Sequence, residues 1–470
     1  MSFGTERTPM VHLIKAPIQT PQPDSYSEGI TSSFSWEFDT RTKRLHTPGK
    51  LTRTLDTPAG TKTSTVDAKW TGDDLGDWWH AYLTGAELSD PEAAARPVRT
   101  VELFCGSGGL ALGFKRACSE LGFETVSMAA IDQDSDALSV YQANHHARLI
   151  SDRSVSAIID FSCRGKGDDA KFLYAPELVT SDFGVDAARW DSLVDHVDVV
   201  LAGPPCQGHS NLNNHTRRTD ARNDLYLTVP AFAIAVGAPI VIIENVPAVI
   251  HDRRGVVAKT KQLLKDAGYS VTDGVISASS MGWPQHRQRY FIVARRDQAP
   301  LQLASVSTAL RRDVPLPLWW AIKDLENQKL GEGLHLTAEV SPENQQRIDW
   351  LFDNEAYDLP LSERPDCHKQ GTSYGAVYGR LRQQSPAPTL TTGFLTPGRG
   401  RYIHPTRRRT LTPWEAARLQ GFPDTYKFEL RGRTPYKQQL GKWIGDAVPM
   451  PLGFAAAMSA LASGPIVPSK

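Results

Sequence analysis

One cysteine lies where the end of a strand would present its thiol to a ligand. In VDVVLAGPPCQG an apolar run is followed by two prolines, and Cys206 comes directly after them. The prolines restrict the backbone, so the thiol is held rigidly at the strand end, where a helix dipole or a nearby cation would favour the thiolate. Most cysteines of intracellular proteins are small buried residues. The setting of Cys206 instead predicts a nucleophile.

An acid and two basic residues lie at the ends of further apolar runs. Glu244 comes after IVII, and a partly desolvated carboxyl group at such a place has a raised pKa and can carry a proton. A surface glutamate at a strand end is the alternative. In QHRQRYFIV, Arg287 and Arg289 alternate with polar residues. Because alternate residues of a strand share a face, we expect both arginines to point into one cleft.

A glycine-rich turn and a second acid indicate a binding edge. VELFCGSGG places Gly106, Gly108 and Gly109 between a strand and a helix. Such a turn lets backbone N–H groups approach a ligand, and the helix N-terminus favours an anion, although the turn alone is weak evidence for a nucleotide-like cofactor. Asp132 ends the next strand and is placed to accept hydrogen bonds from ribose hydroxyls. Capping the following helix is its alternative role, which Asp134 could also fill.

Strand and helix patterns alternate around these residues, from residue 98 to about residue 297. Strand patterns are VRTVELF, TVSMAAI, VDVVLAG and APIVIIENV. Helix patterns are LALGFKRACSEL, SDALSVYQAN and AKTKQLLKDAG, and a helical or kinked segment is expected around Pro230. The alternation predicts an α/β unit with a largely parallel sheet. Ligands of such sheets bind beyond the carboxyl ends of the strands, where the candidate residues lie.

The composition sets limits on the class of protein. The 470 residues are 40% hydrophobic and 22% charged, which is enough for two or three folding units. We find no apolar run of 18 residues and no secretory signal pattern at the N-terminus, so we expect a cytoplasmic protein without a membrane span. The five cysteines form no C-x-x-C pair, which argues against a disulfide framework and a structural zinc site. We expect no metal.

A nucleic-acid partner is not indicated by the overall charge, which is formally zero. Polyanion binding would have to come from local patches. Residues 41–69 contain seven Lys and Arg against two Asp, and residues 399–409 contain five Arg and no acid. Each run alone is more simply interpreted as a solvated surface.

Six motifs in order resemble those of one enzyme family. They are VELFCGSGG, GPPCQGHS, ENV, QHRQRYF, RRRTLTPWEAARLQGFP and GDAVPMPLG. From about residue 98 to residue 460 the chain resembles the cytosine-C5 DNA methyltransferases of the Dcm-like bacterial or phage type. PAPTLTT and GRGRYIHP resemble the target-recognition domain of that family. The resemblance implies a Rossmann-like α/β fold with a mostly parallel sheet, a smaller irregular target-recognition domain and an N-terminal extension.

The resemblance also implies S-adenosyl-L-methionine as cofactor and a set of residues around it. Asp132 would hold the ribose and Asp152 would lie near the adenine, while Leu225 and the GDAVP segment would close the pocket. The expected cofactor-binding residues are Phe104, Gly106, Gly108, Gly109, Asp132, Asp152, Pro204, Leu225, Asp446, Ala447 and Val448.

By the same resemblance, Cys206 is the nucleophile, Glu244 the acid on cytosine N3 and Arg289 the donor to cytosine O2, with Arg287 close by. The chemistry needs these types, because carbon 5 becomes nucleophilic only after a thiolate adds to carbon 6. A proton at N3 and a fixed cation at O2 then stabilise the ring. The base that removes the carbon-5 proton is not identified.

The target base must leave the duplex before it can react. GHSNLNNHTRRTDARND, which follows Cys206, is typical of a loop that closes over DNA, and Arg217, Arg218 and Arg222 could contact phosphates. Beside a recognition domain, the basic run 399–409 is also predicted to face DNA.

Four segments are expected along the chain. An N-terminal extension of unknown role spans residues 1–97, the catalytic and cofactor-binding domain spans residues 98–300, the target-recognition domain spans residues 301–408, and residues 409–470 return to the catalytic domain. The last segment opens with a helix in LTPWEAARLQGF that starts at Thr412 or Pro413 and ends at Gly421.

The chain departs from the family pattern at a few positions. Glu102 stands where many members have aspartate, and Gln133 replaces a bulky residue that stacks on adenine. In the last motif Trp443 replaces a polar residue and Asp446 replaces an asparagine. The stretch from Asp152 to Cys206 is longer than in a compact member, and contains a charged surface excursion.

The expected partner is double-stranded DNA, bound by a monomer in the nucleoid, with a cognate restriction endonuclease acting on the same site. Two alternatives remain at this stage: methylation of cytosine in tRNA on the same scaffold, and a catalytically inactive DNA-binding homologue. No spacing rule predicts the DNA sequence that is recognised.

Overall fold

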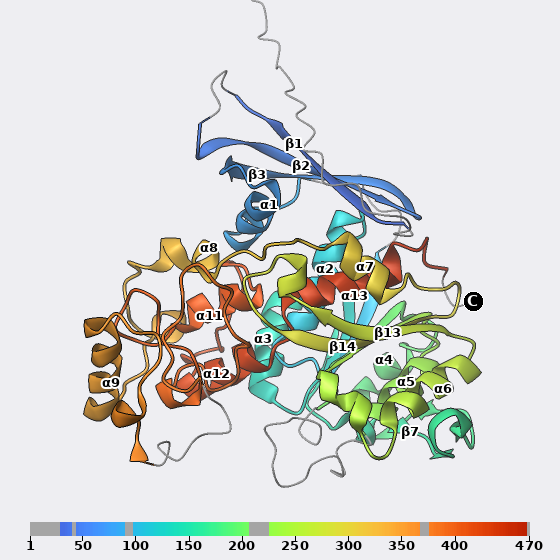
Figure 1. Cartoon of the computed structure of the whole chain (residues 1–470). Helices are drawn as coiled ribbons and strands as arrows, with labels where there is room; N and C mark the ends of the chain where they lie inside the picture. Colours follow the sequence, from blue (N-terminus) through green and yellow to red (C-terminus); the bar gives the residue numbers. More distant parts are fainter. Residues whose placement is uncertain (1–28, 40–43, 90–96, 206–224, 367–375, 468–470) are drawn as a thin grey trace, which may run out of the picture.

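A seven-stranded sheet forms the centre of the molecule (Figure 1). The computed structural model describes residues 29–39, 44–89, 97–205, 225–366 and 376–467. The strands follow the order β13-β14-β12-β11-β4-β5-β6, and only β14 runs antiparallel to its neighbours. This confirms the predicted α/β fold with a mostly parallel sheet. Their bounds are β4 (Val98–Leu103), β5 (Thr125–Ile131), β6 (Leu149–Ser151), β11 (Val199–Ala202), β12 (Ile240–Asn245), β13 (Ser270–Ser277) and β14 (Gln288–Arg295).

Helices cover both faces of the sheet, which explains why its strands are apolar throughout. In β11, Val199 and Leu201 join the core on the side of α2, α3 and α13, whereas Val200 and Ala202 join the core on the side of α5 and α6. The predicted helices are confirmed, including the one that contains Pro230. Their bounds are α2 (Gly109–Glu120), α3 (Ser135–His145), α5 (Leu225–Ala235), α6 (Val256–Asp266) and α13 (Met450–Leu461).

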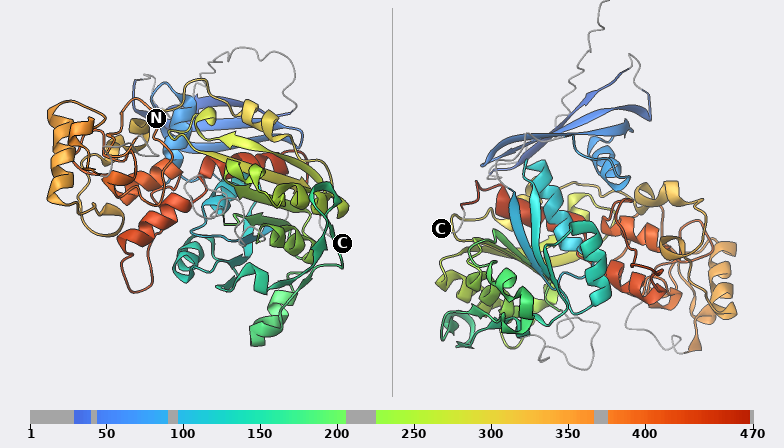
Figure 2. Two further views of the ribbon diagram at one scale, coloured as in Figure 1. Left: turned by 60° about the horizontal axis from the view of Figure 1, so that its bottom comes forward. Right: turned by 180° about the vertical axis from the view of Figure 1, so that it is seen from behind.

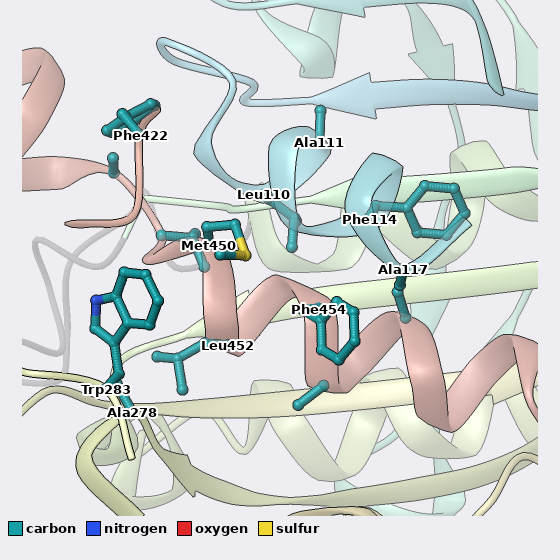
Figure 3. Close-up of a cluster of buried hydrophobic side chains, with 14 of the residues drawn as sticks. Leu110, Ala111, Phe114, Ala117, Ala278, Trp283, Phe422, Met450, Leu452 and Phe454 are labelled. Carbon is teal, nitrogen blue, oxygen red and sulfur yellow. The ribbon is translucent and has the colours of Figure 1, made fainter. Parts of the chain in front are cut away.

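Helix α13 comes from the far end of the chain and packs against α2 (Figure 3). A Cβ atom on Gly113 would lie 2.4 Å from the carbonyl oxygen of Met450, so only glycine allows this approach. The stretch Lys437–Leu461 is long and apolar enough to span a membrane, but 94% of its most apolar window is buried inside the protein. It comprises α12 (Lys437–Asp446) and α13, and its apolar residues belong to the hydrophobic core.

Residues 31–39 and 44–83 form a three-stranded antiparallel sheet and a helix, which lie above α2 and α13 in Figure 1. The FSWEF stretch lies mainly in β1 (Thr31–Glu37), followed by β2 (Thr47–Thr57) and β3 (Gly60–Trp70). The Trp-rich end forms α1 (Asp74–Leu83), whose Trp79 ring lies 5.5 Å from that of Phe454 and 6.1 Å from that of Trp283. This N-terminal unit therefore shares the core of the central sheet.

A buried ionic cluster joins the N-terminal unit to α2. The Glu120 carboxylate accepts hydrogen bonds from Arg53 of β2 (2.9 Å), from Arg116 of α2 (2.7 Å) and from the Trp78 indole of α1 (3.0 Å). Arg53 and Glu120 are almost completely buried, and Arg116 also lies over the Trp78 ring. A buried charge is stable only when it is paired, so the cluster holds the three elements together.

Two smaller parts complete the molecule. The excursion before residue 206 contains β7 (Ile159–Asp160) paired with β10 (Glu177–Leu178), β8 (Cys163–Arg164) paired with β9 (Lys171–Phe172), and α4 (Ala187–Asp191). The described residues between 301 and 408, which are 301–366 and 376–408, are largely irregular and lie mostly at one end of the molecule (Figure 2). They contain α7 (Leu303–Ala309), which packs on β13 and α13, α8 (Leu318–Ile322) and α9 (Pro342–Asp353), which helps to form a separate small core.

The helix predicted in LTPWEAARLQGF is α11 (Pro413–Gln420). Thr412 is its N-cap in a capping box with Glu415, and Gly421 ends it at φ +90°. The predicted start and end of this helix are confirmed.

Replacing Glu120 with Gln should destabilise the protein strongly, because two buried guanidinium groups would lose their carboxylate. The expected loss in the free energy of unfolding is about 3–5 kcal/mol, measured by urea denaturation. As a control, Asp186→Asn removes the exposed ion pair with Arg189 (2.9 Å) and should cost about 0–1 kcal/mol. Equal losses in both variants would show that the cluster does not hold the N-terminal unit.

Candidate active site

The site lies where the order of the sheet changes direction. From β4 the chain proceeds through β5 and β6 on one side, and then returns to β11 and β12 on the other. Ligands of open α/β sheets bind at such a switch point, beyond the carboxyl ends of the strands. The turn after β4 and the Gly203–Pro205 segment after β11 therefore flank one crevice.

The glycine turn lies between β4 and α2, and three of its residues have left-handed conformations. Phe104, Gly106 and Gly108 have φ values of +56°, +50° and +87°. A Cβ atom on Gly106 would have no neighbour within 4 Å, so this side of the turn is open for a ligand. A Cβ atom on Gly109 would lie 2.6 Å from the carbonyl oxygen of Val448, which brings the GDAVP segment directly onto the turn.

The carboxylate of Asp132 is bound into the same turn. Its oxygens accept hydrogen bonds from the backbone N–H groups of Gly106 and Asp134, each at 2.8 Å. Burial raises the pKa of Asp132, whereas these hydrogen bonds and Lys442 lower it. Asp134, not Asp132, caps α3 through Ala137. Each carboxylate oxygen of Asp132 has further lone-pair capacity, which suits ligand hydroxyl groups.

Glu244 and Arg289 form an ion pair at the carboxyl end of β12, with 2.7 Å between Oε1 and Nε. The antiparallel direction of β14 brings its first residues beside the end of β12, where Glu244 is level with Phe291. A Cβ atom on Gly203 would lie 3.7 Å from both the Glu244 Oε2 atom and the Phe104 carbonyl oxygen, so the carboxylate faces the crevice. Burial raises the pKa of Glu244, against the lowering effect of Arg289 and Arg287.

The prolines before Cys206 are tied to the ENV segment. The Asn245 side chain donates a hydrogen bond to the carbonyl oxygen of Pro204 (3.1 Å). Sequence reasoning missed this role of Asn245, although its place after Glu244 in ENV pointed to it. Pro204 is buried, while Cys206, Arg217, Arg218 and Arg222 lie outside the described residues. The described chain resumes at Leu225, the first residue of α5.

Arg287 has a different arrangement from Arg289. It is 2% exposed, and its guanidinium donates hydrogen bonds to the carbonyl oxygens of Leu390 (2.5 Å), Gly445 (3.0 Å) and Ala447 (3.0 Å). Both arginines act on the pKa of Glu244, so they do lie near one cleft. Arg289 is the arginine that forms the 2.7 Å ion pair with the glutamate.

The remaining predicted residues lie on the same edge of the sheet. Asp152 is exposed and directly follows β6, and Asp446 ends α12. Burial raises the pKa of Asp446, whose carboxylate in turn raises that of Glu244. Sequence reasoning did not predict that Ser107 would donate to the carbonyl oxygen of Trp443 (2.9 Å), a contact that spans 336 residues.

The basic run 399–409 is largely neutralised within residues 301–415. Arg401 pairs with Asp358, Arg408 with Asp353 (2.6 Å) and Asp349 (3.3 Å), and Arg409 with Glu415 (2.7 Å), while Arg407 lies 3.8 Å from Glu326. Within the described residues, Arg399 alone of the five has no ion pair. In the run 41–69, Arg53 is buried in the Glu120 cluster. The run 399–409 therefore carries much less free positive charge than its composition indicated.

Beneath the turn, β4 carries a buried acid. Glu102 is 1% exposed, and desolvation raises its pKa to about 8, although hydrogen bonds from Tyr141 and the Ala111 backbone oppose the shift. It is thus a neutral carboxylic acid near neutral pH, packed below the edge that holds Asp132.

Comparisons with known proteins agree with this geometry. A family model described as C-5 cytosine-specific DNA methylase matches residues 98–163 and 169–461. The chain is 39% identical over 383 residues to the type II methyltransferase M1.BsuMI of Bacillus subtilis, covering 81% of this chain and 84% of that protein. It is 29% identical to the type II methylase M.HgiDII of Herpetosiphon aurantiacus, covering 76% of this chain and 94% of that protein.

One solved structure supports the fold. It is a DNA modification methyltransferase encoded within an Escherichia coli prophage, which superposes with a TM-score of 0.51 at 22% identity. The alignment covers 77% of this chain and 98% of that one.

Replacing Glu102 with Gln should change how stability depends on pH. The pKa of Glu102 in the folded protein, about 8, lies above the 4.5 of an unperturbed glutamate, so the folded protein holds a proton that the unfolded chain releases. The contribution of Glu102 to the stability of the wild-type protein therefore falls by about 1.4 kcal/mol per pH unit between these values, whereas glutamine does not ionise. Relative to wild type, the variant should gain stability from pH 5 to pH 8 in urea titrations. Exposed Glu124→Gln should give a constant difference, and a constant difference for Glu102→Gln would contradict the assignment.

Proposed function

Because the chain belongs to the C-5 cytosine-specific DNA methylase family, and is thus a DNA (cytosine-5-)-methyltransferase, we propose how its residues perform the reaction. The methyl group comes from S-adenosyl-L-methionine, the cytosine is flipped out of duplex DNA, and the transfer proceeds through a covalent bond between Cys206 and carbon 6. The observation that carries this proposal is the pair of Glu244 and Arg289 at the crevice, next to the prolines that lead to Cys206.

The pair supplies the two groups that the activated ring requires. As the Cys206 thiolate bonds to carbon 6, the ring takes up a proton at N3 from Glu244, which burial favours in its protonated form. Arg289 donates to O2, where negative charge develops. Carbon 5 then takes the methyl group, a base removes the carbon-5 proton, and the electron pair of that bond expels the thiolate. N3 returns its proton to Glu244 in the same step.

The cofactor would bind along the edge formed by the glycine turn and the GDAVP segment. The open side of Gly106 admits the ligand, Asp132 accepts from the ribose hydroxyls, and Asp152 lies at the adenine end. Bound there, S-adenosyl-L-methionine supplies an electrophilic methyl group on a sulfonium. Phe104, Gly108, Gly109, Pro204, Leu225, Asp446, Ala447 and Val448 complete the proposed contacts.

Duplex DNA is the substrate of the family, and we assign its recognition to residues 301–408. Their small separate core and irregular backbone suit a domain that presents loops to a groove. Arg399 is exposed and is the member of the basic run best able to meet phosphates. We assign residues 98–300 and 409–470 to the catalytic domain.

The names of the relatives suggest a biological setting. M1.BsuMI and M.HgiDII are type II enzymes, so we propose that this protein protects DNA from a restriction endonuclease that acts on the same sequence. It would act as a monomer on DNA in the bacterial cytoplasm, associated with the nucleoid.

The substrate can be tested with labelled S-adenosyl-L-methionine. We expect label in duplex DNA that lacks 5-methylcytosine and none in tRNA, because the family acts on DNA. Bisulfite sequencing of DNA from cells that express the protein should then give the recognised sequence. Labelled tRNA with unlabelled DNA would overturn the choice of substrate.

Replacing Cys206 with Ala should abolish methyl transfer and leave DNA binding within about twofold of wild type, because only the nucleophile is lost. Activity is measured by methyl transfer and binding by gel shift. Cys163→Ala, which changes a cysteine of the excursion, is the matched control and should retain full activity. Turnover by the Cys206 variant would rule out the covalent route.

A further inference from the structure

The end of α12 is held by side chains from three distant segments. The last carbonyl groups of a helix have no partners within the helix and must find others. Here Ser107 donates to the carbonyl oxygen of Trp443 (2.9 Å) and Gln420 donates to that of Ile444 (2.5 Å). Arg287 donates to those of Gly445 and Ala447. A cation at this position is also favoured by the helix dipole.

The same guanidinium group holds the recognition region. Its other nitrogen, Nη1, donates to the carbonyl oxygen of Leu390 at 2.5 Å. Leu390 belongs to PAPTLTT, residues 386–392, which is fastened to the segment that carries Arg287: Ala387 exchanges backbone hydrogen bonds with Pro284 and His286 (2.8 and 2.7 Å). Arg287 therefore joins the recognition region to the segment that closes the proposed cofactor pocket.

Two glycines of α12 make this junction tight. A Cβ atom on Gly445 would lie 2.5 Å from the Thr391 carbonyl carbon and the Thr392 nitrogen, and a Cβ atom on Gly441 would lie 2.7 Å from the Thr392 oxygen. Positions four residues apart share one face of a helix. The backbone of PAPTLTT thus lies directly on α12, and neither can shift without moving the other.

We propose that Arg287 is a positioning residue that couples DNA recognition to cofactor binding. If PAPTLTT moves when DNA binds, the movement would be transmitted to Gly445 and Ala447 through the Arg287 guanidinium and through the face of α12 that carries the two glycines. It would then change how the cofactor pocket closes. The proposal rests on the cofactor and the DNA substrate proposed above. A role of Arg287 as a charge that acts only on Glu244 would be kept by lysine. The positioning role would not be kept, because the bridge depends on the planar fork of the guanidinium, which lysine does not have.

The test compares Arg287→Lys with Arg295→Lys. Arg295 ends β14, the strand that begins directly after Arg287. It is fully buried and donates to the carbonyl oxygens of Ala460 (2.7 Å) and Gly464 (3.1 Å), which belong to neither PAPTLTT nor α12. Binding of S-adenosylhomocysteine is measured by calorimetry, with and without sheared duplex DNA that lacks 5-methylcytosine. The thermal midpoint of each variant reports the general cost of losing a buried arginine.

For Arg287→Lys we expect about tenfold weaker binding of S-adenosylhomocysteine and loss of the effect of DNA on that affinity. Arg295→Lys should lower the thermal midpoint but keep both the affinity and the DNA effect. Gly445→Ala, which displaces PAPTLTT by another route, should reproduce the loss of the DNA effect.

An Arg287→Lys protein with wild-type affinity and an unchanged DNA effect would overturn the proposal, and so would equal losses in the Arg295→Lys control. Failure of the wild-type protein to bind S-adenosylhomocysteine at all would instead contradict the proposed cofactor. The two failures are therefore distinguishable.

Discussion

The parallel pairing of β4 with β11 is the constraint on which the site depends. Because the two strands run side by side in one direction, the turn after Leu103 and the prolines after Gly203 leave the sheet at the same edge. Neighbouring connections then go to opposite sides, which opens the crevice between them. The antiparallel β14 completes the edge from the other direction, because its beginning, rather than its end, lies beside Glu244.

The sequence predicted those features that depend on interactions between residues close together in the chain. The start of α11 at Thr412 or Pro413, its end at Gly421 and the turn after β4 follow from propensities within a few residues. The sheet followed from apolar runs and their alternation with helices. Periodicity predicted that Arg287 and Arg289 share a cleft, and the family resemblance placed Glu244 and Arg289 on one base. The ion pair between Glu244 and Arg289 was not predicted, since periodicity indicates a face but not a partner.

Contacts between distant segments were not predictable in the same way. The acceptors of Arg287 lie 103 to 160 residues away in sequence and are backbone oxygens. Because every residue has a backbone oxygen, the residue types in the sequence do not identify these acceptors. The basic run 399–409 looked like free positive charge because the acids that form ion pairs with its arginines lie outside the run, such as Asp358 and Asp353. The N-terminal unit looked separable because nothing in residues 1–97 reveals that Arg53 finds Glu120.

The contact of α2 with α13 has a consequence for synthesis of the protein. The turn that begins α2 leaves the ribosome early, but Val448 and Met450, which approach Gly109 and Gly113, emerge more than 330 residues later. Contacts so distant in sequence form late, and a chain of this size passes through incomplete states first. An unfinished chain lacks one wall of the pocket that the finished one closes. A nascent or C-terminally truncated polypeptide that ends before Val448 cannot make the contacts that Val448 and Met450 form with the glycine turn and α2.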